Sequence, residues 1–304
     1  MAVNQSTTID QFPATARQDV AIDVARPEPA HRRPAPVNAL LYLLLILLSL
    51  VFISPFVWLV LASLKPSSEV FSGNLLPSRM TWENYAHVFQ YAPIGRWLLN
   101  TMLISTLSVV LVIFSSLVVA YGFARLRFRG RGMLFGVLLA SYMLPGAVTM
   151  IPTFLIWNKL GLIGTFFPLF LGNLFGSSFY IFMLRQFFKN IPQDLMDAAR
   201  LDGAGYFRVL FGVLLPLLKP ALVAIGVFEF QAKWDDFLIP LIYLNKRDDF
   251  TLSLGLASFK ADYDMDWGLL MAASVMMTIP MIILFFAAQK LFIQGLSAST
   301  GIKG

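Results

Sequence analysis

The sequence predicts an all-α, polytopic membrane protein with six transmembrane helices. Of its 304 residues, 58% are hydrophobic and only 13% are charged, and the mean hydropathy is +0.72. Soluble globular domains have far more charge and less apolar content. A helix needs about 20 mostly apolar residues to cross a hydrocarbon core about 30 Å thick, and the apolar runs of this chain reach that length. The buried helices of a soluble enzyme would have shorter apolar runs.

Six apolar runs meet the length requirement for a membrane span. They cover residues 40–64, 98–124, 133–156, 165–187, 217–244 and 269–292. Pro145 and Pro280 lie inside two of these runs, and we expect each proline to kink or break its span. Such a break is tolerated where protein or water satisfies the freed carbonyl groups, so both spans are expected to face protein or a translocation path.

The distribution of lysine and arginine predicts that both termini lie in the cytoplasm, because positive charge collects on the cytoplasmic side of a membrane. With that orientation the loop 125–132, RLRFRGRG, is cytoplasmic and carries four arginines. The remaining predicted cytoplasmic basic residues are Arg17, Arg26, Arg32, Arg33, Arg185, Lys189, Arg200, Arg208, Lys219, Lys290 and Lys303. We interpret the net charge of +6 as topology and contact with anionic lipid rather than nucleic-acid binding.

The domain organisation is predicted to be simple. Residues 1–36 are polar, contain prolines and show no apolar periodicity, which is typical of a disordered tail. Residues 37–304 then form one six-helix transmembrane domain. The chain has no cysteine, which excludes disulfides, thiol catalysis and cysteine-ligated metals.

One polar segment, LMDAARLDGA at residues 195–204, interrupts the apolar pattern between the fourth and fifth spans. Pro192 suits a first helical turn, early carboxylates and a later arginine match the helix dipole, and Gly203 is typical of a helix end. These signals predict a short helix over residues 192–202. Leu195, Ala198 and Ala199 then share one face, small enough to enter a protein groove. Packing of that face on the protein's own spans is the alternative.

The string Asp197-Ala198-Ala199-Arg200-Leu201-Asp202-Gly203-Ala204 resembles the EAA loop of ABC importer permeases, here within a loop of residues 189–216. Asp197 replaces the glutamate of the family pattern. The order of six spans and the tail from Gln289 to Gly304 are similar to the carbohydrate-importer branch, specifically its second, six-span permease subunit of the maltose type. In that branch a Trp-Asn-acid-Phe pattern ends the fifth span, whereas this chain has Trp234-Asp235-Asp236-Phe237.

The resemblance implies a type I ABC importer permease fold, which is MetI-like, in the bacterial cytoplasmic (inner) membrane. The short helix would be a coupling helix that docks on a cytoplasmic ATPase. The residues implied in coupling are Leu195, Asp197, Ala198, Ala199, Asp202 and Gly203. The implied partners are a second permease, two ATP-binding subunits and an extracytoplasmic solute-binding protein. Because this chain has no G-x-x-x-x-G-K-[ST] phosphate loop, ATP and magnesium would be bound by the partner, and the permease would be non-catalytic and need no cofactor.

The fifth span carries an unusual number of polar residues for a membrane helix. Each charged residue within a span costs about 2.5–3.5 kcal/mol on insertion scales, so such residues usually face an interior or an aqueous cavity. The cluster is a candidate path for a polyhydroxylated solute; its members are Glu229, Gln231, Lys233, Trp234, Asp235 and Asp236. The alternative for any one of these residues is a paired, structural role in helix packing.

Three other functional assignments remain open from the sequence. Permeases for glycerol phosphate or glycerophosphodiesters look similar, so the solute class is not limited to sugars. An ion-coupled secondary transporter could use the intramembrane acids, although such folds usually have inverted repeats, which we do not find here. A membrane enzyme is disfavoured because the two histidines, His31 and His87, lie in the tail and in a loop.

Overall fold

The computed structural model describes residues 35–259 and 266–300, and within these ranges every regular element is helical. This confirms the all-α prediction. The chain divides into two compact units, residues 1–55 and 56–304. The described part of the first unit is the beginning of helix α1 (Ala35–Ser63), and its side chains from Ala39 onward are exposed. The predicted tail of residues 1–36 lies, except for its last two residues, outside the described residues.

Among the residues that the structure describes, four helical segments are long and apolar enough to cross a membrane. They are Ala39–Ser63 within α1, α3 (Ile94–Arg125), the segment Phe167–Asn190, and Trp267–Lys290 within α14 (Trp267–Thr300). Two bent pairs raise the number to six if each pair is one span. Helices α4 (Arg131–Tyr142) and α5 (Gly146–Lys159) form the first pair, and Tyr206–Leu217 with α11 (Lys219–Trp234) form the second.

The two prolines expected to disturb spans behave differently. The chain bends by 98° between α4 and α5, and Pro145 precedes α5 with an extended backbone, so this break was predicted correctly. Helix α14, in contrast, continues through Pro280. A proline loosens the carbonyls of the preceding turn, and the carbonyl of Met277 there accepts a hydrogen bond of 3.2 Å from Nε1 of Trp234. A side chain of the neighbouring helix α11 therefore contacts the turn before this proline.

The fifth predicted span differs most from the structure. Helix α11 ends at Trp234, about 24 Å along its axis from its start at 1.5 Å per residue. Asp235 and Asp236 lie in a break that precedes the short helix α12 (Leu238–Tyr243), so the helix is not continuous up to residue 244. At the other end, residues 206–217 form a helical segment, bent by 80° from α11, that the sequence had assigned to a loop.

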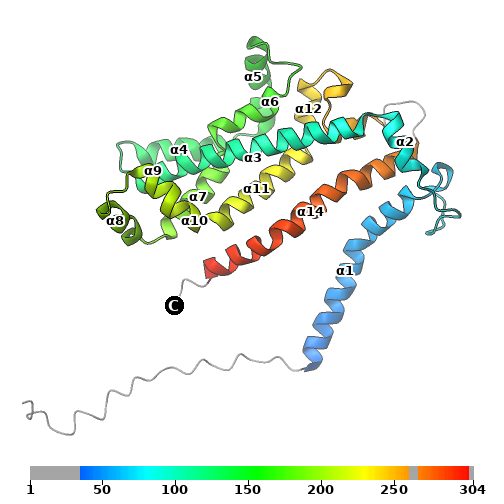
Figure 1. The fold of residues 1–304 in the computed structure, drawn as a ribbon, viewed down its shortest axis with the longest axis horizontal. Coiled ribbons are helices and arrows are strands. Elements are labelled where there is room, and N and C mark those ends of the chain that lie inside the picture. The colour runs from blue at the N-terminus through cyan, green and yellow to red at the C-terminus, as the bar shows by residue number, and fades with distance from the viewer. Residues whose placement is uncertain (1–34, 260–265, 301–304) are drawn as a thin grey trace, which may run out of the picture. The chain divides into compact units, whose positions relative to one another are not determined.

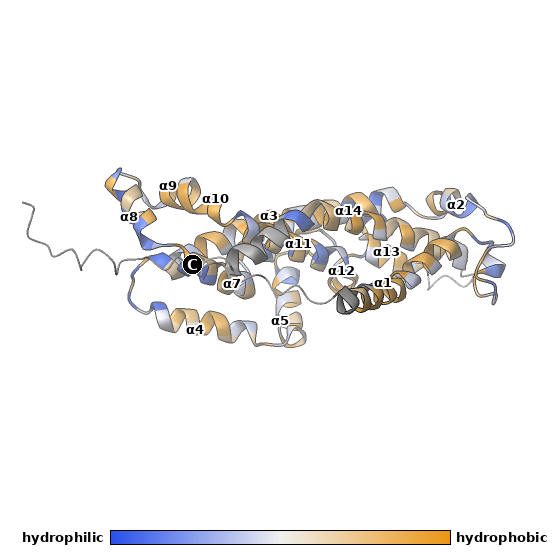
Figure 2. Cartoon of the chain, turned by 90° about the horizontal axis from the view of Figure 1, so that it is seen from below, coloured by the Kyte–Doolittle hydropathy of each residue, from blue (hydrophilic) through white to orange (hydrophobic). Residues whose placement is uncertain are grey.

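Helix α3 organises the second unit. It packs against α7 (Ser178–Asn190) and α11 along much of its length, and α11 in turn packs against α14 (Figure 1). Apolar residues dominate these helices, while hydrophilic residues gather in the connections (Figure 2). Two main apolar clusters result, one near the C-terminal end of α3 around Leu184 and Phe188, and one near its N-terminal end around Trp97 and Trp234.

The N-terminal end of α3 holds the connection that follows α12. Nε1 of Trp97 donates to the carbonyl of Arg247 at 2.7 Å, and Nδ2 of Asn100 donates to the carbonyls of Asp248 and Phe250 at 3.0 Å each. The smaller elements of the unit are η2 (Ser67–Glu69), α2 (Glu83–Tyr91), α6 (Phe167–Phe170), η3 (Leu171–Phe175), α8 (Gln193–Leu201), α9 (Tyr206–Arg208), η4 (Val209–Leu214), α10 (Leu215–Leu217), η5 (Arg247–Asp249) and α13 (Leu252–Ser258).

Candidate functional site

Helix α8 (Gln193–Leu201) lies where the sequence predicts a short helix, and its termination is well defined. The amide of Gly203 donates to the carbonyl of Arg200 at 2.9 Å, and the amide of Ala204 donates to that of Ala199 at 3.0 Å. This pair of bonds is a Schellman motif, which requires a left-handed residue after the helix. Gly203 has φ +78° and meets that requirement. The chain therefore turns sharply after α8.

The faces of α8 are separated more clearly than the sequence indicated. Met196 is fully buried in the apolar cluster around Leu184, and Ala199 packs against the same cluster. Leu195 is 44% exposed and Leu201 is 90% exposed, and Ala198 is exposed too. Leu195 and Ala198 thus point away from the bundle, whereas Ala199, expected on their face, belongs to the inner side. Packing of Met196 on its own bundle determines this rotation of the helix.

The exposed apolar surface extends beyond α8 into α9. Phe207 is 71% exposed and Tyr206 is also exposed. Together with Leu195 and Leu201 they form a surface that we call the α8–α9 apolar surface. Large apolar side chains gathered at the end of a bundle, among polar connections, are typical of a protein contact.

Arg125, at the end of α3, fixes the position of α8. Its guanidinium donates to the carbonyls of Phe188 and Ile191, the latter at 2.5 Å, and to Oε1 of Gln193 at 2.9 Å. One side chain therefore joins the end of α3, the end of α7 and the start of α8. Because Met196 is buried as well, α8 is attached to the bundle at two points and would transmit a displacement to α3 and α7.

Asp197 and Asp202 lie at different places on this segment. Oδ1 of Asp197 accepts a hydrogen bond of 3.2 Å from Nε2 of Gln193 and lies 4.0 Å from Nη1 of Arg200. Both contacts are within α8, so the carboxylate of Asp197 has local partners on the exposed helix surface. Asp202 is exposed and caps the helix through its backbone.

The polar residues near the C-terminal end of α11 fall into two groups. Members of the first group have hydrogen-bond partners within the chain, and members of the second group are exposed. Glu229 is only 7% exposed, and its Oε1 accepts a hydrogen bond of 2.6 Å from Nδ2 of Asn173 in η3. Ser115 of α3 donates to the carbonyl of Asn173 at 2.8 Å. The carboxylate thus belongs to a buried network joining α3, η3 and α11. Its environment is that of a packing residue.

Trp234 and Asp236 also have partners within the chain. Trp234 is buried, bonds the carbonyl of Met277 and stacks on Phe230 with 5.5 Å between ring centroids. Oδ1 of Asp236 accepts from the amide of Ile239 at 3.2 Å, which stabilises the first turn of α12. These contacts hold the C-terminal end of α11 in place.

Gln231 and Asp235, in contrast, are exposed on one side of α11, at positions i and i+4. Lys233 is partly buried, and within residues 35–259 and 266–300 it has no carboxylate within 4.0 Å. An exposed amide and carboxylate at the end of an apolar helix are suited to contact with protein or water rather than with lipid tails.

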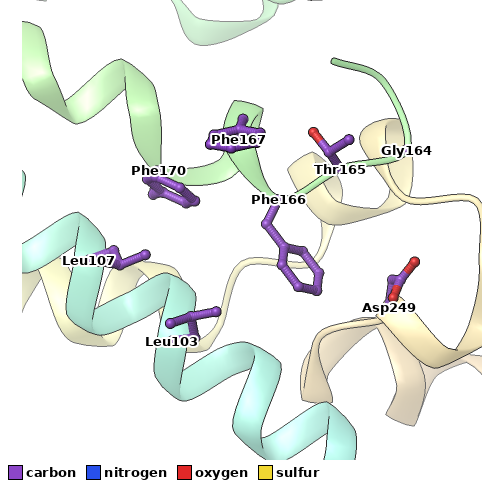
Figure 3. Close-up of a pocket in the computed structure, with 8 residues that line it drawn as sticks. All are labelled: Leu103, Leu107, Gly164, Thr165, Phe166, Phe167, Phe170 and Asp249. Carbon is purple, nitrogen blue, oxygen red and sulfur yellow. The ribbon is translucent and has the colours of Figure 1, made fainter. Parts of the chain in front are cut away.

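A separate cavity of about 350 Å³ lies between α3 and the segment that begins α6 (Figure 3). Its walls are mainly apolar, formed by Leu103, Leu107, Phe166, Phe167 and Phe170, with Gly164, Thr165 and Asp249 completing the lining. Asp249 is also 3.6 Å from Nη2 of Arg96, so its carboxylate has a charged partner. The cavity is distinct from the polar side of α11 and offers mostly apolar contact.

Three residues of the site, Arg125, Met196 and Asn173, were not singled out from the sequence. Arg125 belongs to a basic loop whose composition already fits the membrane-topology rule, so its role as an anchor of α8 has no separate sequence signal. Met196 could have been found from the helical period, because it stands three residues before Ala199 and four after Pro192. Asn173 lies in an apolar run, and a lone amide there is a weak sign of a buried hydrogen bond.

Comparison with known proteins places this geometry in a family. Residues 112–298 match the model of the family described as "Binding-protein-dependent transport system inner membrane component". The chain is 36% identical, over 87% of its length and 95% of the relative, to the arabinooligosaccharides transport system permease protein AraQ of Bacillus subtilis (strain 168). It is 33% identical, over 86% of its length and 88% of the relative, to the diacetylchitobiose uptake system permease protein NgcG of Streptomyces coelicolor.

A solved structure agrees with the fold. A chain from the crystal structure of a bacterial ABC transporter involved in the import of the acidic polysaccharide alginate aligns with a TM-score of 0.76 and 25% identity, covering 87% of this chain and 99% of that one. The helical architecture, the match over most of the second unit and the extent of sequence identity agree. The chain belongs to the family of binding-protein-dependent transport system inner membrane components, as a multi-pass ABC transporter permease.

Proposed function

We propose that this permease forms half of the translocation pathway for an oligosaccharide and couples to a cytoplasmic ATPase through α8. The similarity to permeases named for arabinooligosaccharides and diacetylchitobiose, at 36% and 33% identity, supports a carbohydrate solute. The proposed assembly contains a second permease, two ATP-binding subunits and an extracytoplasmic solute-binding protein. Both termini are proposed to lie in the cytoplasm, on the same side as the arginine-rich connection between α3 and α4 at residues 125–132.

The observation that carries this proposal is the combination of exposure and attachment at α8. Leu201 is 90% exposed and Phe207 is 71% exposed, while Met196 and Arg125 hold the same segment to the bundle. An apolar surface that loses contact with water on binding contributes favourable free energy, about 25 cal/mol per Å². Because α8 is firmly attached to the bundle, a movement of the docked ATPase would be transmitted through α8 to α3 and α7.

The solute path is proposed to run along the side of α11 that carries Gln231 and Asp235. Both side chains are exposed and free to bind hydroxyl groups, whereas Glu229 and Trp234 have partners within the chain. If this side of α11 faces the second permease, the two subunits would enclose a polar passage between them.

The coupling role is tested with Leu201→Ala in the complete transporter. Because Leu201 makes almost no contact within the chain, its truncation is expected to leave folding intact and to weaken retention of the ATPase subunit on purification. Leu76→Ala is the matched control, since Leu76 is also exposed, at 67%, but belongs to the connection before α2. Equal retention of the ATPase in both variants and the native protein contradicts docking at α8.

The solute class is tested by binding measurements on the co-encoded solute-binding protein. Arabino-oligosaccharides, chitin disaccharides and glycerophosphodiesters are compared, followed by ATP-dependent uptake of the best ligand in proteoliposomes. Saturable binding and uptake of an oligosaccharide are expected. Exclusive binding of glycerol phosphate or a glycerophosphodiester contradicts the carbohydrate assignment and leaves the permease role standing.

A further inference from the structure

A polar cavity lies between the C-terminal end of α3, the start of α4 and α8. Its volume is about 680 Å³, within the range of about 300–1,000 Å³ typical of small-ligand sites. It is lined by Ala124, Arg125, Leu126, Arg127, Arg131, Gln193, Asp197, Arg200 and Tyr206. Hydrophilic residues gather at this end of the chain, around α8 and at the start of α4 (Figure 2).

The charge of this cavity is unbalanced. Four arginines line it, against one carboxylate, that of Asp197, which already lies 4.0 Å from Arg200. Nε of Arg125 is buried and has no hydrogen-bond partner within the described residues. Guanidinium groups held close together repel one another unless an anion lies between them, and they are well suited to bind phosphate oxygens.

The arginines are held in place by the fold. Arg125 is fixed by the carbonyls of Phe188 and Ile191, and Nη1 of Arg131 donates to the carbonyl of Leu126 at 3.0 Å. Arg127 is exposed at the rim. A site with two fixed cations and a third on a short connection is partly organised before a ligand arrives, which lowers the entropic cost of binding.

The depth of the cavity in the bilayer favours a lipid as the source of the phosphate. Helix α3 has 32 residues and is about 48 Å long, whereas a bilayer including its headgroup regions is about 40–45 Å thick. The end of α3 at Arg125 therefore lies close to headgroup level. Helix α4 begins at Arg131 and at once presents Met133, Leu134 and Val137 as exposed apolar side chains that acyl chains would cover. A soluble anion or an acidic peptide has no acyl chains and would leave that apolar surface uncovered.

We propose that this cavity binds the phosphate headgroup of an anionic phospholipid, with Arg125, Arg127 and Arg131 as ligands and the acyl chains along α4. Basic cavities between membrane helices are known to take anionic headgroups. The site uses the Gln193 and Arg200 side of α8, which is separate from the exposed Leu195 and Leu201 side. A bound lipid would thus brace α8 against α3 and α4 and leave Leu195, Leu201 and Phe207 uncovered. Tyr206 is the member of the α8–α9 apolar surface that also lines the cavity.

The test measures phosphatidylglycerol binding to the complete transporter in neutral phosphatidylcholine nanodiscs. Arg127→Gln is expected to weaken binding about fivefold, the factor for one basic side chain near an anionic surface. Arg129→Gln is the matched control, because Arg129 is an exposed arginine of the same connection that does not line the cavity. Binding should remain native in that variant, and excess inorganic phosphate should not displace the lipid.

Other outcomes overturn the proposal. Equal weakening in Arg127→Gln and Arg129→Gln would mean that the surface charge of the whole connection, and not this cavity, attracts the lipid. Displacement of phosphatidylglycerol by inorganic phosphate, or phosphate binding without any lipid preference, would identify a soluble anion as the ligand. Loss of the ATPase subunit in Arg127→Gln with unchanged lipid binding would make the cavity a protein contact. The outcome is independent of which solute the transporter carries.

Discussion

Nδ2 of Asn173 donates a hydrogen bond of 2.6 Å to Oε1 of Glu229, joining η3 to α11 inside the helix bundle. The sequence left two roles open for Glu229, contact with the solute and helix packing, and this bond favours helix packing. A buried carboxylate with an amide partner is costly to disturb, and a disturbed one changes stability before it changes any contact with solute. The following predictions distinguish packing residues from residues that meet a partner or a solute.

Glu229→Ala is expected to destabilise the permease. It removes the nearer acceptor of the partly buried Asn173 amide and leaves only the carbonyl of Ser108, at 3.4 Å, which costs about 1–3 kcal/mol. Glu229→Gln keeps an oxygen at the same place and should be closer to native. Thermal unfolding of the purified transporter checks both variants. Native stability of Glu229→Ala combined with lost uptake would instead support a direct role in the solute path.

Gln231→Ala and Asp235→Ala are expected to behave in the opposite way. Both side chains are exposed, so their truncation should change stability by no more than about 0.5 kcal/mol. If they line the path, the double variant should lower solute uptake while ATPase assembly stays intact. Proteoliposome uptake, with assembly measured in parallel, is the readout. Native uptake by the double variant removes these residues from the path.

Gly203→Ala is expected to loosen the end of α8. Gly203 has φ +78°, a conformation that costs a residue with a Cβ about 1–2 kcal/mol. Gly205→Ala is the matched control, because Gly205 has φ −71° and no atom within 4 Å of its built Cβ. Hydrogen exchange across α8 should rise only in Gly203→Ala. Equal exchange in the two variants would show that the glycine conformation does not control the helix end.

Gly255→Ala is expected to disrupt the connection at the N-terminal end of α3. A Cβ at Gly255 would collide with Cε3 of Trp97, which is held by its bond to the carbonyl of Arg247. Overpacking of this kind costs about 1–3 kcal/mol. The melting temperature should fall in Gly255→Ala and not in Gly122→Ala, where nothing lies within 4 Å of the built Cβ. An unchanged melting temperature in both would show that Trp97 can move aside.

The sequence alone determined the class of molecule and the position of its short polar helix. Run length and charge asymmetry are local properties that the bilayer imposes on any spanning chain, so they are visible without a structure. The limits of α8 were likewise predictable, because a proline before the helix and a glycine after it act on the backbone within a few residues. The bend at Pro145 follows from the same local chemistry.

Only the tertiary structure decided which side chains of each helix face a neighbour. Glu229 and Gln231 stand two residues apart on α11, yet one is buried against Asn173 and the other is exposed, since α3, η3 and α11 meet on one side only. Pro280 remains inside a continuous helix, and Trp234, 46 positions earlier in the sequence, donates to a carbonyl of the turn before that proline. Such contacts join residues far apart in the chain, and helical period and composition describe only residues that are near one another.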